Sequence, residues 1–160
     1  MASLQVGKTL PYFELYDQNG QLFKSDAYVG NYRLVIYFYP KDHTPGCTKQ
    51  ACEFRVQYPA WSKEGVLVVG ISSDAVGNHF QFAADYRLPF TLLSDPQSKL
   101  RKQWEVPRQM MGLLPGRVTY LVGLSGQIEH IIDTPFPLKH IDETRHWIES
   151  FHKKNLPKEV

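Results

Sequence analysis

A chain of 160 residues with 42% hydrophobic content is long enough for one packed domain and too apolar to be disordered throughout. Its net charge of +2, without a basic run, argues against a nucleic-acid partner. No apolar stretch reaches the roughly 20 residues of a membrane span, and residues 1–7 lack the basic and apolar regions of a signal peptide. We therefore expect a single domain over residues 1–160 that is cytoplasmic and not bound to a membrane. An organelle protein whose transit peptide has been removed would show the same features, so this alternative stays open.

The first part of the chain predicts a hairpin and then a buried strand. Residues 12–15 and 22–23 have the pattern of two short strands, joined by an Asn-Gly turn at 17–20. Residues 32–39 follow as a nearly unbroken run of β-branched and aromatic residues. A run of this kind is typical of a central strand that is covered on both faces.

A helix is predicted from about Thr48. Its buried face is marked by apolar residues at helical spacing, namely Ala51, Phe54, Tyr58 and Trp61. Pro59 lies inside this pattern and has no N–H to donate to the carbonyl of Arg55. We therefore expect a kink or a break in the helix at this proline.

The rest of the chain continues the alternation of strands and helices. The pattern predicts strands at 66–71 and 91–93, helices at 75–87 and around 97–103, a hairpin at 118–122 and 128–132, and a last helix with an apolar stripe at Leu138, Ile141, Ile148 and Phe151. Residues 104–116 match no regular pattern. The order of elements predicts an α/β fold in which a central mixed β-sheet has helices on both faces and an N-terminal β-hairpin.

The first of the two cysteines, Cys47, has the setting of a reactive thiol. It follows a turn signal at 44–46, after a buried strand and at the start of a helix. Ligands bind at the carboxyl ends of strands in α/β sheets, and a helix N-terminus presents free N–H groups and partial positive charge. Both features favour a thiolate, which is the nucleophilic form of cysteine.

Cys52 lies five residues further along the same predicted helix. Five helical residues place two side chains about 140° apart and their Cα atoms roughly 8.7 Å apart, beyond the limit of about 7 Å for a disulfide. A bond between Cys47 and Cys52 would therefore require the first helical turns to unwind. The apolar neighbours of Cys52 are equally compatible with a small buried side chain that takes no part in chemistry.

Other roles for the cysteines are less well supported. A zinc site built from His43, Cys47 and Cys52 would lack a fourth ligand, so we expect no metal. A thioredoxin-type redox site has two residues between its cysteines, and this pair has four. The remaining histidines show no pattern beyond solvated or capping side chains; they are His79, His130, His140, His146 and His152.

The segment FYPKDHTPGCTKQACEFR resembles the active-site signature of the peroxiredoxins, and within them that of the bacterioferritin-comigratory-protein, or peroxiredoxin Q, subgroup. The family pattern of a proline, a threonine and the peroxidatic cysteine is matched by Pro40, Thr44 and Cys47. Cys52 matches the subgroup's resolving cysteine. Further matches lie at 6–8, 13–20, 70–72, 90–95 and 117–121, so the resemblance covers nearly the whole chain.

The resemblance implies a thioredoxin-like fold and a thiol peroxidase that needs no cofactor. Such an enzyme reduces hydrogen peroxide and organic hydroperoxides and takes electrons from thioredoxin or a similar dithiol. Cys47 would form a sulfenic acid, and Cys52 would resolve it as an intramolecular disulfide. We expect a monomer or a weak homodimer.

The resemblance also suggests roles for residues around Cys47. The hydroxyl of Thr44 would bind the peroxide, and Arg117 would hold the thiolate and the peroxide oxygens with its fork of donors. Backbone N–H groups at Gly46 and the cysteine would complete the cradle. Pro40 would shield the sulfur from water, and Gln50 would either orient Arg117 or lie in solvent on the helix surface.

Two other functions remain open on the same fold. One is a dithiol–disulfide oxidoreductase, and the other is a redox-sensing module in which the disulfide exposes a surface. Thr44 and Arg117 favour the peroxidase, because disulfide exchange needs neither side chain.

Overall fold

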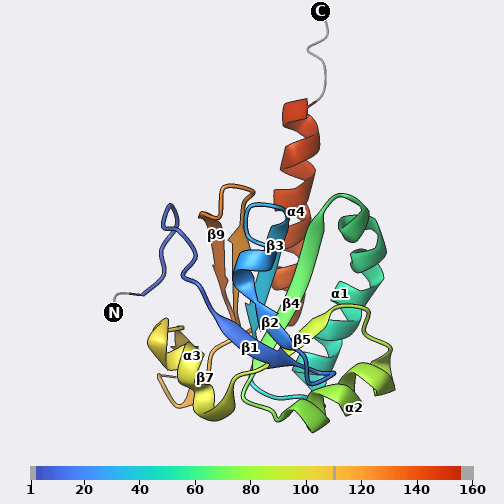
Figure 1. Cartoon of the computed structure of the whole chain (residues 1–160), viewed down its shortest axis with the longest axis vertical. Helices are drawn as coiled ribbons and strands as arrows, with labels where there is room; N and C mark the ends of the chain where they lie inside the picture. Colours follow the sequence, from blue (N-terminus) through green and yellow to red (C-terminus); the bar gives the residue numbers. More distant parts are fainter. Residues whose placement is uncertain (1–2, 110, 156–160) are drawn as a thin grey trace, which may run out of the picture.

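A mixed β-sheet lies at the centre of the computed structural model, which describes residues 3–109 and 111–155 (Figure 1). Within these residues the sheet has seven strands in the order β2-β1-β5-β4-β3-β8-β9. β3, β4 and β5 run parallel, and β1 and β8 pair antiparallel with β5 and β3. The strands are β1 (Glu14–Asp17), β2 (Leu22–Lys24), β3 (Arg33–Phe38), β4 (Val66–Ser72), β5 (Thr91–Ser94), β8 (Val118–Val122) and β9 (Ile128–Asp133).

Helices cover both faces of the sheet, as the sequence predicts. α1 (Pro45–Lys63), α2 (Val76–Tyr86) and α4 (Pro137–Asn155) share one core with the side chains of Val35 and Tyr37. α3 (Lys99–Gln103) and the N-terminal segment pack on the other face, against Leu34, Ile36 and Phe38. Figure 1 shows α3 set apart from the other three helices. None of the helices in the described part of the chain is long and apolar enough to cross a membrane.

Of the kink or break predicted at Pro59, the break is wrong, because α1 continues through this residue to Lys63. A proline inside a helix costs about 3 kcal/mol. Phe54 and Trp61, on either side of Pro59, are buried, and burying each large apolar side chain contributes about 1.5–3 kcal/mol. Packing of this face therefore outweighs the one hydrogen bond that is lost. The helix also begins at Pro45, three residues before the predicted start.

The segment without a predicted pattern, 104–116, is anchored by Trp104. This side chain is 1% exposed and makes edge contacts with Phe13, Phe38 and Tyr120. A short hairpin follows, whose two strands have two residues each: β6 (Arg108–Gln109) and β7 (Leu114–Pro115). The remaining short helices are η1 (Ser25–Ala27) and η2 (Pro96–Ser98). The segment is therefore fixed to the core at Trp104 and Val106, and the chain returns to the sheet at the first residue of β8.

Candidate active site

Cys47 is the third residue of α1, and the loop before it leaves the carboxyl end of β3. Its side chain is only 2% exposed, and both Cys47 and Cys52 are free thiols. The first turn of α1 contains no acidic residue, and its N-cap, Thr44, makes no side-chain cap hydrogen bond. The partial positive charge of the helix end is therefore left uncompensated beside the sulfur of Cys47.

Arg117 reaches this sulfur because of strand pairing. β8 begins at Val118, which pairs with Phe38 at the end of β3, so the residue before β8 lies beside the loop that follows β3. Arg117 is 8% exposed, and its Nη1 is 3.5 Å from Cys47 Sγ. Its Nε donates to the carbonyl of Pro135 at 3.3 Å. The guanidinium is therefore held at both its Nε and its Nη1 side.

Gln50 lies one turn after Cys47 and is fully buried. Its Oε1 accepts a hydrogen bond from Arg117 Nη1 at 2.6 Å. Its Nε2 is buried without a hydrogen-bond partner in the described part of the chain. The structure thus brings Cys47, Gln50 and Arg117 together and places Gln50 inside the protein rather than on its surface.

Thr44 and Pro40 lie on the loop that joins β3 to α1. The hydroxyl of Thr44 donates its proton to the carbonyl of Lys41 at 2.8 Å, which leaves its oxygen available as an acceptor. Pro40 is half-buried. The N–H groups of Gly46 and Cys47 belong to the first helical turn, where no carbonyl of the helix can accept them.

Gly46 lies directly under the guanidinium. A Cβ atom on this glycine would be 2.9 Å from Arg117 Nη2 and 3.6 Å from Pro137 Cγ. We expect Gly46→Ala to displace the guanidinium. In the reaction with peroxide that the family resemblance implies, the rate should fall about tenfold, because small misplacements of a binding group are costly. Alanine is the better helix former by about 0.5–1 kcal/mol, which offsets part of the stability lost when the guanidinium moves from its hydrogen bonds.

The matched control for this change is Gly77→Ala. Gly77 is also the second residue of its helix, and apart from its chain neighbours and the backbone of its own helix, no atom lies within 4 Å of the position its Cβ would take. This variant should keep the wild-type peroxide rate in stopped-flow measurements. Equal rates for both variants would mean that the contact between residue 46 and Arg117 has no effect on the reaction.

His140 lies behind Arg117 and is fully buried, which corrects the expectation of a solvated or capping histidine. Its Nε2 donates to the carbonyl of Thr134 at 2.8 Å, and its Nδ1 accepts from Thr119 Oγ1 at 2.7 Å. Burial lowers the pKa of His140 to about 4, and the nearby charge of Arg117 acts in the same direction. A polar residue inside an apolar stripe leaves no trace in hydrophobic periodicity, so the sequence could not reveal it.

The low pKa of His140 predicts a loss of stability in acid. His140 has a pKa of 6.5 in the unfolded chain and of about 4 in the folded protein. Between these pH values the unfolded chain binds more protons than the folded protein, so lowering the pH shifts the equilibrium toward the unfolded chain. The free energy of unfolding should fall as the pH drops from 7 to 4, by up to about 3 kcal/mol from this group at 1.36 kcal/mol per pKa unit. Urea unfolding of wild type and His140→Gln measures it. Identical pH slopes for the two proteins would contradict the assignment.

The zinc alternative is not supported by the geometry. His43 Nε2 is bound to Asp85 Oδ2 at 2.9 Å rather than turned toward the cysteines. Within the described residues, the grouping of possible metal ligands is Asp42, Asp74 and His79. Neither cysteine belongs to it.

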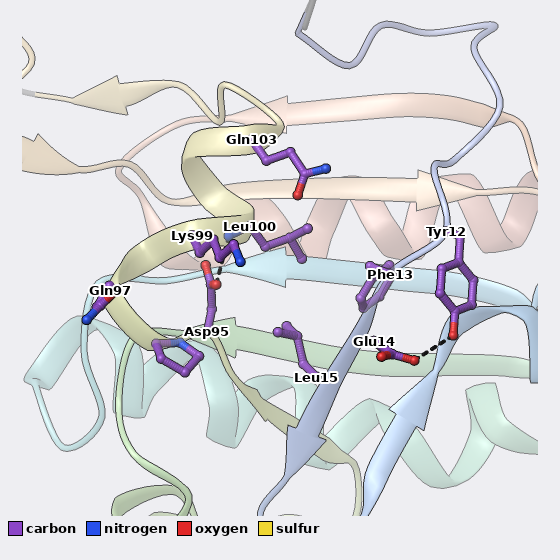
Figure 2. A pocket seen from close by; sticks show the side chains of 10 residues that line it. Tyr12, Phe13, Glu14, Leu15, Asp95, Gln97, Lys99, Leu100 and Gln103 are labelled. Carbon is purple, nitrogen blue, oxygen red and sulfur yellow. Dashed lines mark hydrogen bonds between the residues drawn. The ribbon is translucent and has the colours of Figure 1, made fainter.

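A hollow of about 390 Å³ lies on the opposite face of the sheet, between α3 and the segment that leads into β1. Figure 2 shows Tyr12 and Glu14 on one side, where the tyrosine hydroxyl donates to the carboxylate at 2.8 Å. Asp95, on the other side, accepts hydrogen bonds from the N–H groups of Leu100 and Arg101 and so caps α3. Tyr12, Glu14 and Asp95 are thus engaged in local structure, and the candidate chemistry lies at Cys47.

Comparison with known sequences shows the family of the chain. A model of the AhpC/TSA family matches residues 6–131. The chloroplastic peroxiredoxin Q of Populus jackii is 48% identical over 150 residues, which cover 93% of this chain and 70% of the relative. The chloroplastic peroxiredoxin Q of Sedum lineare is 47% identical over 150 residues, which cover 93% of this chain and 80% of the relative.

Solved structures agree with the sequence comparison. The peroxidoxin BcpB of Mycobacterium tuberculosis superposes with a TM-score of 0.83 at 32% identity, over 92% of this chain and 97% of that one. A cysteine-to-serine mutant of PrxQ from Xylella fastidiosa gives a TM-score of 0.84 at 28% identity, over 93% and 98% of the two chains. The expected thioredoxin-like fold is thereby confirmed.

The same relatives show that the prediction of a cytoplasmic protein is wrong. The peroxiredoxins Q of Populus jackii, Sedum lineare and Gentiana triflora are chloroplastic. The prediction depended on residues 1–7 alone. Targeting is directed by segments outside the folded domain, so the properties of the domain do not determine where the protein works.

Proposed function

The chain belongs to the AhpC/TSA family and is a thiol peroxidase of the peroxiredoxin Q group, and on this basis we propose that Cys47 reduces hydroperoxides and Cys52 resolves the product. The observation that supports this assignment best is the contact of 3.5 Å between Arg117 Nη1 and Cys47 Sγ at the start of α1. We further propose that hydrogen peroxide and organic hydroperoxides are the substrates and that thioredoxin is the reductant.

The first step is attack of the Cys47 thiolate on the terminal oxygen of the hydroperoxide. The O–O bond breaks, the sulfur becomes a sulfenic acid, and the departing alkoxide or hydroxide takes up a proton to leave as alcohol or water. Arg117 and the free N–H groups of the first turn stabilise the negative charge that moves from sulfur to oxygen. The oxygen of Thr44 accepts a hydrogen bond from the peroxide O–H.

The second step forms the disulfide. The Cys52 thiolate attacks the sulfenic sulfur, and hydroxide leaves and is protonated to water. Because both cysteines lie in α1, the start of this helix must unwind before the two sulfurs can bond. A dithiol of the thioredoxin type then exchanges with the disulfide and returns both cysteines to thiols.

Unwinding of α1 predicts a change in amide hydrogen exchange. On oxidation, residues 47–56 should lose protection, while residues 60–64 and the central strand at 34–38 keep theirs. Buried Trp61 anchors the second half of the helix, and local opening costs only part of the global stability. Equal protection in the reduced and disulfide forms would mean that the bond forms without unwinding. Loss of protection beyond Trp61 would mean that the helix opens as a whole.

The deciding experiment is peroxide consumption coupled to thioredoxin, thioredoxin reductase and NADPH, with hydrogen peroxide and cumene hydroperoxide as substrates. We expect NADPH oxidation that requires the peroxide, thioredoxin and this protein together. An insulin reduction assay runs in parallel. Reduction of insulin without consumption of peroxide would replace the peroxidase with a dithiol–disulfide oxidoreductase.

A further inference from the structure

A second buried polar cluster lies beneath the loop between β3 and α1. His79, on α2, is fully buried, and Asp42, on the loop, is 4% exposed. His79 Nδ1 is 2.6 Å from Asp42 Oδ2, and the hydroxyl of Tyr39 donates to Asp42 Oδ1 at 2.5 Å. The sequence offered no sign of this pair, because the two residues are 37 positions apart and each is a single polar residue.

Counting protons shows that the pair is electrically neutral. His79 Nε2 is 2.9 Å from the carbonyl oxygen of Leu93, which can only accept, so Nε2 carries a proton. One further proton lies between His79 Nδ1 and Asp42 Oδ2. Wherever it is located, the histidine and the carboxylate together carry no net charge. Burial of such a pair is tolerable only while both partners are present.

The hydrogen bonds of these residues also argue against a metal ion in this cluster. Ligand atoms of Asp42, Asp74 and His79 lie within 4.8 Å of one another. Both ring nitrogens of His79 and both carboxylate oxygens of Asp42 are already engaged within the protein. Asp74 Oδ2 accepts from the Asp42 backbone N–H at 2.9 Å and from Ser72 Oγ at 2.6 Å. These bonds form a hydrogen-bond network that holds the backbone of the loop at Asp42.

The network fixes a strained turn directly before Thr44. His43 adopts a φ of 65°, a left-handed conformation that costs a non-glycine residue about 1 kcal/mol or more. Its ring is held by Asp85 Oδ2 at 2.9 Å and lies against Phe82, so α2 binds the loop at two successive residues. Strain of this kind persists only where the surroundings enforce it.

We propose that His79 is a positioning residue for peroxide reduction: through Asp42 it fixes the loop so that the hydroxyl of Thr44 points at the peroxide. This inference rests on the proposed function. Asp42 and Thr44 are two residues apart, and Thr44 Oγ1 is oriented by the carbonyl of Lys41, which belongs to the same loop. The Lys41 carbonyl shares its peptide plane with the Asp42 N–H, which donates to Asp74 Oδ2 at 2.9 Å. Loss of His79 leaves the buried Asp42 carboxylate without this partner. A shift of Asp42 toward solvent would then carry this peptide plane, and the Lys41 carbonyl with it, out of position.

The test compares two reactions of Cys47 in His79→Phe. Peroxide oxidation needs Thr44 in place, whereas alkylation by iodoacetamide needs only a thiolate. We expect the second-order rate with hydrogen peroxide to fall by at least tenfold and the alkylation rate to change by less than twofold. The control is His146→Phe, an exposed histidine on α4, which should leave both rates unchanged.

A double-mutant cycle with Thr44→Val decides whether the effect passes through the hydroxyl. If it does, His79→Phe should lower the peroxide rate by less than twofold in the Thr44→Val background. Full additivity, or equal losses in the peroxide and alkylation rates, would overturn the proposal.

Two precautions keep the outcome clear. If His79→Phe does not fold, His79→Asn replaces it, because its amide keeps a donor for Asp42. It should lower the peroxide rate by about threefold, again without a further loss beside Thr44→Val. A wild-type protein that does not react with peroxide would contradict the proposed function itself, and this measurement is made first.

Discussion

Cys47→Ser is expected to abolish peroxide reduction, whereas Cys52→Ser should complete one reaction with peroxide and then stall as a sulfenic acid. Cys47 lies at the uncapped end of α1 beside Arg117, where a thiolate is stabilised. Cys52 lies about 1.4 turns further on, and its thiol is needed only after the O–O bond has broken. Single-turnover stopped-flow kinetics, with dimedone to trap the sulfenic acid, separate the two steps.

The control is the wild-type protein without a reductant, which should react once and form no lasting sulfenic acid. A Cys47→Ser variant that retains the first reaction, together with a Cys52→Ser variant that loses it, would reverse the assignment. Dimedone labelling of wild type at the level of Cys52→Ser would mean that Cys52 does not resolve Cys47.

Arg117→Met is expected to lower the second-order rate with peroxide by about a hundredfold, or about 2.7 kcal/mol of transition-state stabilisation. Methionine retains much of the bulk but removes the charge and every donor that contacts Cys47 and Gln50. Arg117→Lys should restore only part of the rate, because an ammonium group cannot hold the sulfur, Gln50 and the Pro135 carbonyl with the same planar fork.

The matched control for this prediction is Arg108→Met, which removes an exposed arginine on β6 that donates to the carbonyl of Gly112. It should leave the peroxide rate unchanged. An unchanged rate in Arg117→Met, or full recovery with lysine, would reduce Arg117 to a structural support for Gln50 and the Pro135 carbonyl.

The spacing of apolar residues along the chain predicted most of the fold, because this spacing depends on which face of each helix or strand is buried. The run at 32–39 became β3, and the hairpin at 12–15 and 22–23 became β1 and β2, with β1 starting two residues later. The break at Pro59 was the clear error. The buried positions Phe54 and Trp61 keep helical spacing across the proline, and their packing matters more to the helix than the missing backbone donor.

The residues around Cys47 were harder to predict from the spacing of residues along the chain. Cys47 is recognisable from its helix start, but Arg117 lies 70 residues away and reaches the sulfur through the pairing of β8 with β3. Without the family resemblance, that arginine has no distinguishing feature. His79 and His140 had none at all, since their importance comes from burial and from partners on other elements.

The weak start of α1 has a consequence for protein engineering. Designers raise heat resistance by adding a capping side chain and acidic residues in the first turn of a helix. Pro45 and Gly46 open α1, and its first turn has neither of these devices. An acidic side chain there would repel the thiolate of Cys47, and a firmer turn would delay the opening that the disulfide requires. Tolerance of heat and speed of turnover therefore compete at this turn, and thermostable variants should be sought by changing other elements.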